Sequence, residues 1–387
     1  MKRKIALLAL LAAFPPLSTD MYLAAIPLLV ENWQQPLATV NLTLVCFFVT
    51  YCGFLLVYGP LSDRYGRRPP LLAGLGLYVG SSLWCAVSGS ITQMILARAF
   101  QGAGAAAASA IVFAICKDIY KGPLRQRIFI QLGIIVAAAP MLAPIIGGWI
   151  IEALSWRWVF VLQAVLGVIA MTGVWMMKES LTTLNADGIK LVFKSYVRLM
   201  GNMPFLLLSL ALACLGYPFF AFIASSSDIY ITGLGYSEKE YGYFFACNAS
   251  AFMIAPLVFS WFARHFTLKR LLPVSYLGVV AASVPLTIVS LPMPYRLAIP
   301  MWLLTFFFAF GRPPGNNLIL EQIDTDVGSA SAFMVFLFFM TGASAMWLVS
   351  LDWPDKVSVL GWMGIIAGAV TLTSWLTINR LHTLRYP

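Results

Sequence analysis

Three charged residues lie inside long apolar stretches of the sequence, where a charge is costly to keep. They are Asp20, Arg98 and Arg312. An ionisable group in apolar surroundings is disfavoured unless it is paired or hydrated, so each of the three is a candidate for chemistry. A carboxylate can take up and release a proton, and an arginine can bind an anion through its fork of N–H donors.

Asp20 is the candidate proton carrier. Both histidines, His265 and His382, lie at the ends of apolar stretches, so an imidazole relay within those stretches is excluded. If the stretches are helices, with a rise of about 1.5 Å per residue, Asp20 and Arg98 reach a similar depth. Two interpretations are open. The two residues share a cavity and couple a proton to a substrate, or they form a fixed ion pair that braces two helices.

Arg312 lies beside Pro313 and Pro314, which interrupt the backbone hydrogen bonds of a helix. An arginine at such a place either binds an anionic group of a substrate or donates to the carbonyls that the prolines leave free. The first interpretation implies a substrate with a carboxylate or a phosphate. The candidates for substrate binding are Asp20, Tyr22, Tyr217, Arg312 and Asn316.

The composition indicates what kind of chain positions these residues. Of the 387 residues, 60% are hydrophobic and 10% are charged, against about 45–50% and about 25% in typical soluble domains. A soluble globule and a disordered chain are therefore excluded, and a multi-span helical membrane protein remains. The six cysteines lie in apolar stretches without a C-x-x-C pattern and are interpreted as small core residues.

Twelve uninterrupted apolar stretches are long enough to cross a bilayer as helices. They are 5–29, 40–61, 70–89, 91–115, 128–151, 157–177, 204–226, 240–262, 271–290, 297–320, 328–350 and 357–379. Twelve crossings place both termini on one side, where nineteen Lys and Arg residues lie against four on the other side. The positive-inside rule places the nineteen, and both termini, in the cytoplasm. The net charge of +10 is thus an orientation signal, and we expect no nucleic-acid partner.

The longest polar stretch divides these crossings into two sets of six. We predict an N-terminal six-helix bundle over 1–178, a cytoplasmic linker over 179–203 and a C-terminal six-helix bundle over 204–387. The basic loop after the second stretch and the basic loop after the eighth occupy equivalent positions in the two sets of six. They lie about 200 residues apart in the sequence, which indicates an internal repeat. Two such repeats are typical of secondary transporters, whose substrate site lies between them.

The loop after the second stretch reads Gly59-Pro60-Leu61-Ser62-Asp63-Arg64-Tyr65-Gly66-Arg67-Arg68-Pro69. We expect Gly59 and Gly66 to permit a tight reversal, and Asp63 to accept from helix N-terminal amides or to pair with an arginine. The string closely resembles the G-x-L-a-D-r-x-G-r-k signature of the major facilitator superfamily. The resemblance implies a conformational latch formed by Gly59, Asp63, Arg64, Gly66 and Arg67.

Three further strings resemble the same superfamily, so that the resemblance covers about residues 15–160. Leu96–Gly104 is similar to its R-x-x-q-G-x-g motif, and Ser18–Pro27 to the D-M-Y-L-P-x-x-P of the Bcr/CflA drug-exporting branch, with Ala24 in place of a proline. Ala143–Gly148 is similar to the antiporter signature G-P-x-x-G-G, with Ala143 in place of its first glycine. The resemblance implies a helix interface that limits leak, although prolines and glycines are also simply tolerated in membrane helices. The residues concerned are Pro140, Pro144, Gly147 and Gly148.

The resemblance implies an all-α membrane protein with twelve transmembrane helices in two six-helix bundles. Its implied function is proton-coupled export by alternating access, as in the drug:proton antiporter family. The alternative is a dedicated exporter of an endogenous anionic metabolite such as a siderophore. A membrane enzyme is less favoured because the sequence holds no paired catalytic groups, and a channel because it rarely needs two repeats.

The expected partners follow from these hypotheses. We expect a small-molecule substrate, either an amphipathic drug or a metabolite, together with protons and the lipid bilayer. The sequence contains no G-x-x-x-x-G-K-[ST] motif and no metal-ligand cluster, so we expect no cofactor and no metal. The resemblance implies a monomer in the bacterial inner membrane with both termini in the cytoplasm.

Overall fold

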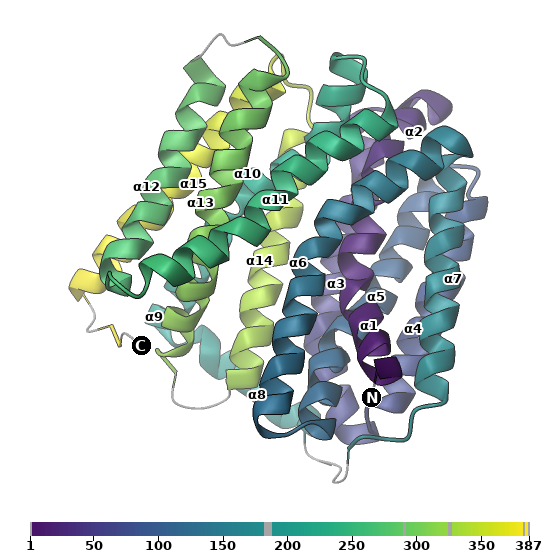
Figure 1. Cartoon of the computed structure of the whole chain (residues 1–387), viewed down its shortest axis with the longest axis vertical. Coiled ribbons are helices and arrows are strands. Elements are labelled where there is room, and N and C mark those ends of the chain that lie inside the picture. Colours follow the sequence, from purple (N-terminus) through teal and green to yellow (C-terminus); the bar gives the residue numbers. More distant parts are fainter. Residues whose placement is uncertain (1, 182–187, 289–291, 324–326, 382–383, 386–387) are drawn as a thin grey trace. The chain divides into compact units, whose positions relative to one another are not determined.

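The chain folds almost entirely into helices. The computed structural model describes residues 2–181, 188–288, 292–323, 327–381 and 384–385 (Figure 1). Within these ranges every regular element is a helix, which confirms the predicted all-α class. The chain forms two compact units, one of Met1–Phe193 with Ser237–Tyr243 and the other of Lys194–Tyr236 with Phe244–Pro387.

The helices of the first unit follow the first six predicted stretches. They are α1 (Lys2–Asp20), the 3₁₀ turn η1 (Leu23–Ala25), α2 (Ile26–Trp33), α3 (Leu37–Tyr65), α4 (Arg68–Val87), α5 (Ile91–Ile119), α6 (Gly122–Ala153) and α7 (Trp156–Trp175).

A short helix, α8 (Gly188–Met200), lies in the predicted linker, and the change from one unit to the other falls within it. Residues 182–187 of that linker lie outside the described residues. The predicted domain bounds of 1–178, 179–203 and 204–387 stay a prediction.

The helices of the second unit follow the last six predicted stretches. They are α9 (Met203–Leu215), α10 (Tyr217–Ser227), the π-helical turn η2 (Asp228–Gly233), α11 (Glu238–Phe262), α12 (Leu268–Ile288), α13 (Tyr295–Leu320), α14 (Val327–Val349) and α15 (Lys356–Leu381). The first residues of α11 belong to the first unit.

Eleven helical segments of the described ranges are long and apolar enough to cross a membrane, and each coincides with a predicted stretch. The remaining predicted stretch, 297–320, corresponds to α13. This helix has 26 residues and is therefore long enough to cross a membrane. Its second half holds Arg312, two prolines and two asparagines, which lower its apolar character. Two of the residues that lower the apolar character of α13, Arg312 and Asn316, are thus candidates for substrate binding.

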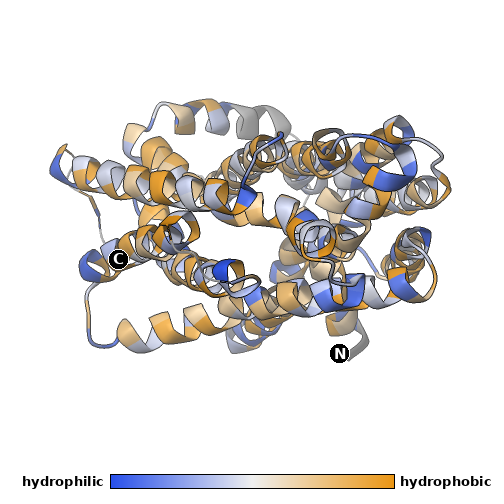
Figure 2. Ribbon diagram, turned by 90° about the horizontal axis from the view of Figure 1, so that it is seen from above, coloured by the Kyte–Doolittle hydropathy of each residue, from blue (hydrophilic) through white to orange (hydrophobic). Residues whose placement is uncertain are grey.

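Hydrophobic residues occur along the helices of both units (Figure 2), and they include exposed as well as buried ones. Large hydrophobic residues such as Ile130, Ile169, Leu257, Ile299 and Ile366 are exposed. A soluble protein rarely exposes apolar surface on this scale, because contact with water is unfavourable. A lipid environment removes that cost, so the exposed residues support the membrane-spanning interpretation of the helices.

Close approach of α4 and α5 forms the centre of the first unit. A Cβ atom on Gly104 of α5 would lie 2.6 Å from the backbone nitrogen of Tyr78, and one on Gly74 of α4 would lie 2.2 Å from the Cβ of Ala107. Membrane helices that pack this closely gain dispersion contacts that lipid cannot supply. The small residues of α5 therefore bring its Arg98 close to the neighbouring helices.

In both units the first membrane span is interrupted near its middle. The span Lys4–Trp33 changes at Asp20 from α1 to a turn and η1 before it continues as α2. The span Met203–Gly233 changes at Gly216 from α9 to α10. The two interruptions lie about 200 residues apart, in agreement with the predicted internal repeat. Interrupted helices are typical of transporter binding sites, because they present backbone polar groups at membrane depth.

Candidate functional site

Asp20 is the last residue of α1 and lies at the interruption of the first span. Its side chain is buried, with 6% of the residue exposed. The Thr19 hydroxyl donates to the Asp20 carboxylate (Oγ1–Oδ1 2.8 Å) and is 3.0 Å from the carbonyl oxygen of Pro15. No cation of the described residues pairs with Asp20. A buried carboxylate with a single neutral donor is able to bind a proton or a cationic group.

Arg98 of α5 is completely buried and reaches α1 beside Asp20 without pairing with it. Its Nη1 donates to the carbonyl oxygen of Ser18 (2.9 Å) and to the side-chain oxygen of Gln101. The guanidinium carbon lies 4.4 Å from the ring centroid of Phe47 and 5.0 Å from that of Tyr22. The interpretation of Asp20 and Arg98 as a fixed ion pair is therefore wrong. A backbone carbonyl, an amide and aromatic faces compensate the charge of Arg98 instead.

A buried hydrogen-bond network connects Arg98 to three further helices. Gln101 donates to the Ser82 hydroxyl of α4 (2.7 Å) and to the side-chain oxygen of Gln163 of α7 (2.9 Å). Gln163 donates in turn to the carbonyl oxygen of Leu17 of α1 (3.0 Å). The network fixes the helices around the interruption of α1, because a polar side chain buried without its partner is costly.

The hydroxyl groups of Ser18 and Tyr78 form a hydrogen bond (2.7 Å) close to this network. The sequence interpretation did not identify Tyr78 or Gln163 as site residues. It named Gln101 within a motif but did not predict its role in the network. The signal for Gln163 was present in the sequence, since an amide in the middle of the apolar stretch 157–177 needs partners within the protein. What the sequence does not give is the identity of those partners.

Tyr22 is buried against the same group of side chains. Its hydroxyl forms a hydrogen bond with the hydroxyl of Thr43 (2.9 Å), and its ring centroid lies 5.3 Å from that of Phe160. No part of Tyr22 is exposed. In this structure the ring packs on Arg98, so the predicted contact with a substrate requires another conformation of the first unit.

The predicted latch is centred on Arg67, between α3 and α4. Arg67 pairs with Asp63 through Nη1 and with Asp118, near the end of α5, through Nε (2.9 Å to Oδ2). Nη1 also donates to the Ser62 hydroxyl (2.8 Å). One guanidinium thus connects the ends of α3 and α5. Arg64, in contrast, lies on the ring of Tyr65 (5.3 Å to the centroid).

The two glycines of the latch have different roles. Gly66 ends α3 with φ at +90°, a backbone conformation that glycine adopts easily, and so forms the predicted reversal. Gly59 lies inside α3, and nothing lies within 4 Å of a Cβ placed on it. The expectation that Gly59 forms part of the reversal is wrong, because the helix continues through Pro60 as far as Tyr65.

Glu179 completes the latch, and the sequence interpretation missed it. Its carboxylate accepts from the backbone N–H groups of Arg67 (2.9 Å), Arg68 (3.0 Å), Ser180 (2.9 Å) and Leu181 (3.0 Å). A carboxylate at the N-terminus of α4 satisfies free N–H groups and interacts favourably with the helix dipole. Partial burial raises the pKa of Glu179, but the four N–H donors outweigh this and hold the pKa below its ordinary value.

Replacement of Glu179 by glutamine is expected to lower the melting temperature at neutral pH. The lowered pKa means that the ionised carboxylate contributes stability fully above its ordinary pKa of 4.5, and that this contribution is lost as the pH falls through the lowered value. The difference in melting temperature between Glu179→Gln and wild type should therefore be constant from pH 6 to pH 8, at about its full value, and shrink below about pH 4.5. A difference that grows on acidification would contradict the assignment.

Asp118 and Asp63 are expected to differ in their contributions to the latch. The side chain of Asp118 is 16% exposed and that of Asp63 is 45% exposed. An exposed pair contributes about 0.2–1 kcal/mol, whereas an interaction with a less exposed partner is screened less by solvent and its loss costs more. Asp118→Asn should thus lower the melting temperature of the purified protein more than Asp63→Asn. Equal shifts would show that Arg67 relies on both carboxylates alike.

The antiporter string lies on α6, which stays continuous through Pro140 and Pro144. Gly147 and Gly148 are buried. A Cβ atom on Gly147 would lie 2.1 Å from the carbonyl oxygen of Met21, the residue after Asp20. Gly147 therefore permits α6 to contact the interruption of α1, which supports the interface interpretation for this residue over simple tolerance.

In the second unit, Arg312 of α13 lines a cavity of about 120 Å³. Its guanidinium carbon lies 3.9 Å from the ring centroid of Phe338 and 5.9 Å from that of Phe308. Arg312 forms no hydrogen bond with any described residue. The interpretation that it donates to carbonyls freed by Pro313 and Pro314 is therefore wrong, since the side chain lies on the ring of Phe338 instead.

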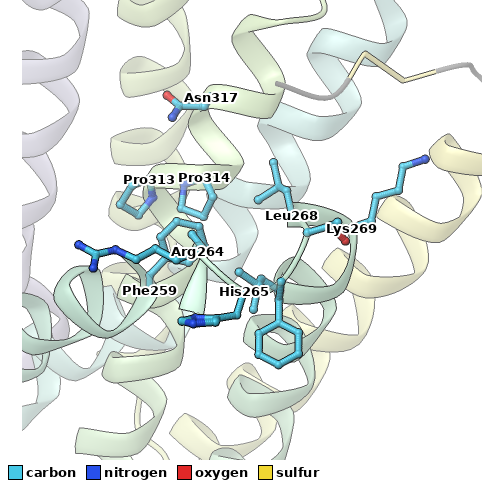
Figure 3. A pocket seen from close by; sticks show the side chains of 12 residues that line it. Phe259, Arg264, His265, Leu268, Lys269, Pro313, Pro314 and Asn317 are labelled. Carbon is cyan, nitrogen blue, oxygen red and sulfur yellow. The ribbon is translucent and has the colours of Figure 1, made fainter. Parts of the chain in front are cut away.

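Asn316 lines the cavity of Arg312, whereas Tyr217 does not. Tyr217 begins α10, and its hydroxyl is 3.5 Å from that of Ser344. The structure thus brings together two of the predicted substrate-binding residues in the second unit. A larger cavity of about 720 Å³ lies on the side of α13 where Pro313, Pro314 and Asn317 are found, and its other wall includes Arg264 and His265 (Figure 3).

Membrane-spanning helices in two units, each with an interrupted first span, are typical of membrane transporters. The chain belongs to the Major Facilitator Superfamily, whose family model matches residues 8–346. The family resemblance inferred from the sequence is thereby confirmed. The protein is a multi-pass membrane transporter and not an enzyme.

Two relatives are named as transporters, and a third is named for drug resistance. The chain is 28% identical over 353 residues to an uncharacterized MFS-type transporter, YdgK, of Bacillus subtilis. The alignment covers 89% of this chain and 88% of the relative. It is 28% identical over 326 residues to the multidrug transporter MdfA of Yersinia pestis, covering 80% and 79%. It is 26% identical over 362 residues to a chloramphenicol resistance protein of Pseudomonas aeruginosa, covering 91% and 86%.

Solved structures of transporters share the fold. A D-xylose-proton symporter matches with a TM-score of 0.76 at 14% identity, covering 95% of this chain and 96% of the symporter. A bacterial homolog of the human lysosomal transporter Spinster, inward-facing and occupied, matches with a TM-score of 0.77 at 12% identity, covering 97% of each chain. At these identities the likeness concerns the fold alone.

Proposed function

We propose that the protein is a proton-coupled exporter of the drug:proton antiporter type, which works by alternating access of its two helical bundles. The observation that carries the proposal is the position of Asp20. It is a buried carboxylate that pairs with no cation of the described residues, at the interruption of the first membrane span. A carboxylate in that environment can hold a proton in one conformation and release it in another.

Asp20 and Arg98 have separate roles in this proposal. Arg98 donates to the Ser18 carbonyl, two residues before Asp20, and thereby fixes the end of α1 through the Gln101 network. Among the described residues, Asp20 has only the Thr19 hydroxyl as a hydrogen-bond partner, so it can exchange a proton for a cationic group of the substrate. Arg98 thus influences Asp20 in two ways, because it fixes the end of α1 and because its positive charge acts on the carboxylate.

The latch supports the conformational part of the proposal. Arg67 joins the ends of α3 and α5, and Glu179 joins the loop after α7 to the start of α4. Such contacts stabilise one of the states between which the protein alternates. The distribution of Lys and Arg supports a cytoplasmic position for the latch and both termini, in a bacterial inner membrane. We propose a monomer as the transporting unit.

The relatives support a drug as the substrate class. Two of them are named for multidrug transport and chloramphenicol resistance, and they match most of this chain. In the proposed mechanism an amphipathic drug leaves the cytoplasm in exchange for protons. The alternative, export of an endogenous anionic metabolite, is favoured by one specific observation, which is the unpaired Arg312.

Reconstitution tests the proposal directly. The purified protein in proteoliposomes should move chloramphenicol or ethidium against its gradient when a pH gradient is imposed. Nigericin, which dissipates that gradient, should abolish the accumulation while protein-free liposomes show none. Accumulation that is independent of the pH gradient would contradict proton coupling, and equilibration without accumulation would indicate a passive pathway.

A further inference from the structure

Arg312 has neither a hydrogen bond nor an ion pair with any residue that the structure describes. It lies on α13, which with 26 residues is long enough to cross a membrane, and no carboxylate is among the residues that line its cavity. The ring of Phe338 lies against one face of the guanidinium (3.9 Å), but a ring face satisfies none of its N–H donors. Donors that have no partner at membrane depth are costly, so the arrangement favours an acceptor from outside the protein.

Asn316 is placed to recognise the same acceptor. It follows Arg312 by four residues on α13, so the two side chains lie on one face of the helix. Asn316 makes no hydrogen bond with a described residue and lines the same cavity. An amide and a guanidinium next to each other supply several N–H donors, which suit the two oxygens of a carboxylate.

The remaining walls of the cavity indicate what accompanies the anionic group. They are largely apolar and include Leu212, Met334 and Phe338. The hydroxyl of Ser209 is also present but donates to the carbonyl oxygen of Phe205 (2.6 Å). The cavity volume of about 120 Å³ is that of a carboxylate with a few attached atoms, since a water molecule occupies about 30 Å³. It therefore accommodates one end of a larger amphipathic molecule.

We propose that Arg312 and Asn316 form a subsite for the carboxylate of an amphipathic, aromatic substrate. The inference rests on the proposed transport function and adds a substrate class to it, namely carboxylates in addition to neutral and cationic drugs. The guanidinium binds the carboxylate through its fork of donors, Asn316 donates from the next turn of α13, and Phe338 and Met334 contact the adjoining apolar part.

The test compares two compounds that differ only in the anionic group, 1-naphthoate and 1-naphthamide. Binding to the purified protein in a neutral detergent is measured by calorimetry at constant pH, without a membrane or a pH gradient. Wild type should bind 1-naphthoate more tightly than 1-naphthamide. Arg312→Gln should lose at least about ten-fold in affinity for 1-naphthoate and little for 1-naphthamide, because a charged hydrogen bond is lost.

Two further variants separate recognition from folding. Arg312→Lys keeps the charge but lacks the fork, and should bind 1-naphthoate with an affinity between those of wild type and Arg312→Gln. Asn316→Ala should weaken 1-naphthoate binding while leaving the melting temperature close to that of wild type. The matched control is Arg264→Gln, which removes an exposed arginine of the same unit that lines the other cavity and should leave both affinities unchanged.

Several results would overturn the subsite. The first is that wild type binds the two compounds with equal affinity. The second is that Arg312→Gln loses affinity equally for both compounds. The third is that both Arg312→Gln and Asn316→Ala bind 1-naphthoate as tightly as wild type does. Binding is measured without a proton gradient, so a failure of proton-driven transport in proteoliposomes would leave this result standing. Conversely, loss of the subsite would leave proton-driven transport of chloramphenicol unaffected.

Discussion

Asp20→Asn is expected to abolish transport driven by a pH gradient, while the protein still folds. Asparagine has nearly the same volume as aspartate and can still accept from the Thr19 hydroxyl, so the interruption of α1 keeps its hydrogen bond. What it cannot do is exchange a proton between the two sides of the membrane. Accumulation in proteoliposomes under an imposed pH gradient should therefore fall to the level of protein-free liposomes.

The matched control for this experiment is Asp118→Asn, which removes a carboxylate from the latch and not from the interior of the first unit. It should change the rate of accumulation and leave its dependence on the pH gradient intact. The melting temperature of Asp20→Asn should be equal to or above that of wild type, because the variant buries no charge. Accumulation by Asp20→Asn at the wild-type rate would exclude this carboxylate as the proton carrier.

Much of the fold could be predicted because membrane-spanning helices are determined mainly by apolar length. The predicted stretch 91–115 and the observed helix Ile91–Ile119 begin at the same residue, and the others differ by a few residues at their ends. The interruption of the first span could not be predicted, since Pro15 and Pro16 lie inside α1 and the helix ends only at Asp20. Prolines identify where a helix is weakened, whereas packing against other helices decides where it ends.

The candidate site was predictable in its members and not in its pairings. Asp20, Arg98 and Arg312 could be found because a charge in an apolar stretch is conspicuous in the sequence. Their partners depend on which atoms the folded helices bring within about 3 Å, and this geometry is not a property of sequence spacing. The carbonyl of Ser18, which accepts from Arg98, and the ring of Phe338, which lies against the guanidinium of Arg312, are groups that no charge pattern identifies.

Contact between α1 and α6 positions the proposed proton site at Asp20, and this contact depends on the absence of a side chain at Gly147. A Cβ atom there would lie 2.1 Å from the carbonyl oxygen and 2.7 Å from the carbonyl carbon of Met21. Both are backbone atoms, which cannot move aside by a change of rotamer. Any side chain at position 147 therefore displaces the turn that follows Asp20.

Gly147→Ala is accordingly expected to destabilise the protein by about 1–3 kcal/mol, the usual cost of overpacking, and to reduce proton-driven transport. Gly133→Ala is the matched control, because Gly133 lies on the same helix and nothing lies within 4 Å of a Cβ placed on it. Alanine favours a helix over glycine by about 1 kcal/mol, so the control should be as stable as wild type or more stable. If the two variants had equal melting temperatures and equal transport rates, helix propensity alone would account for both, and α6 would not hold the interruption of α1 in place. A selective loss in Gly147→Ala would show that the antiporter string acts on Asp20 through the backbone of Met21.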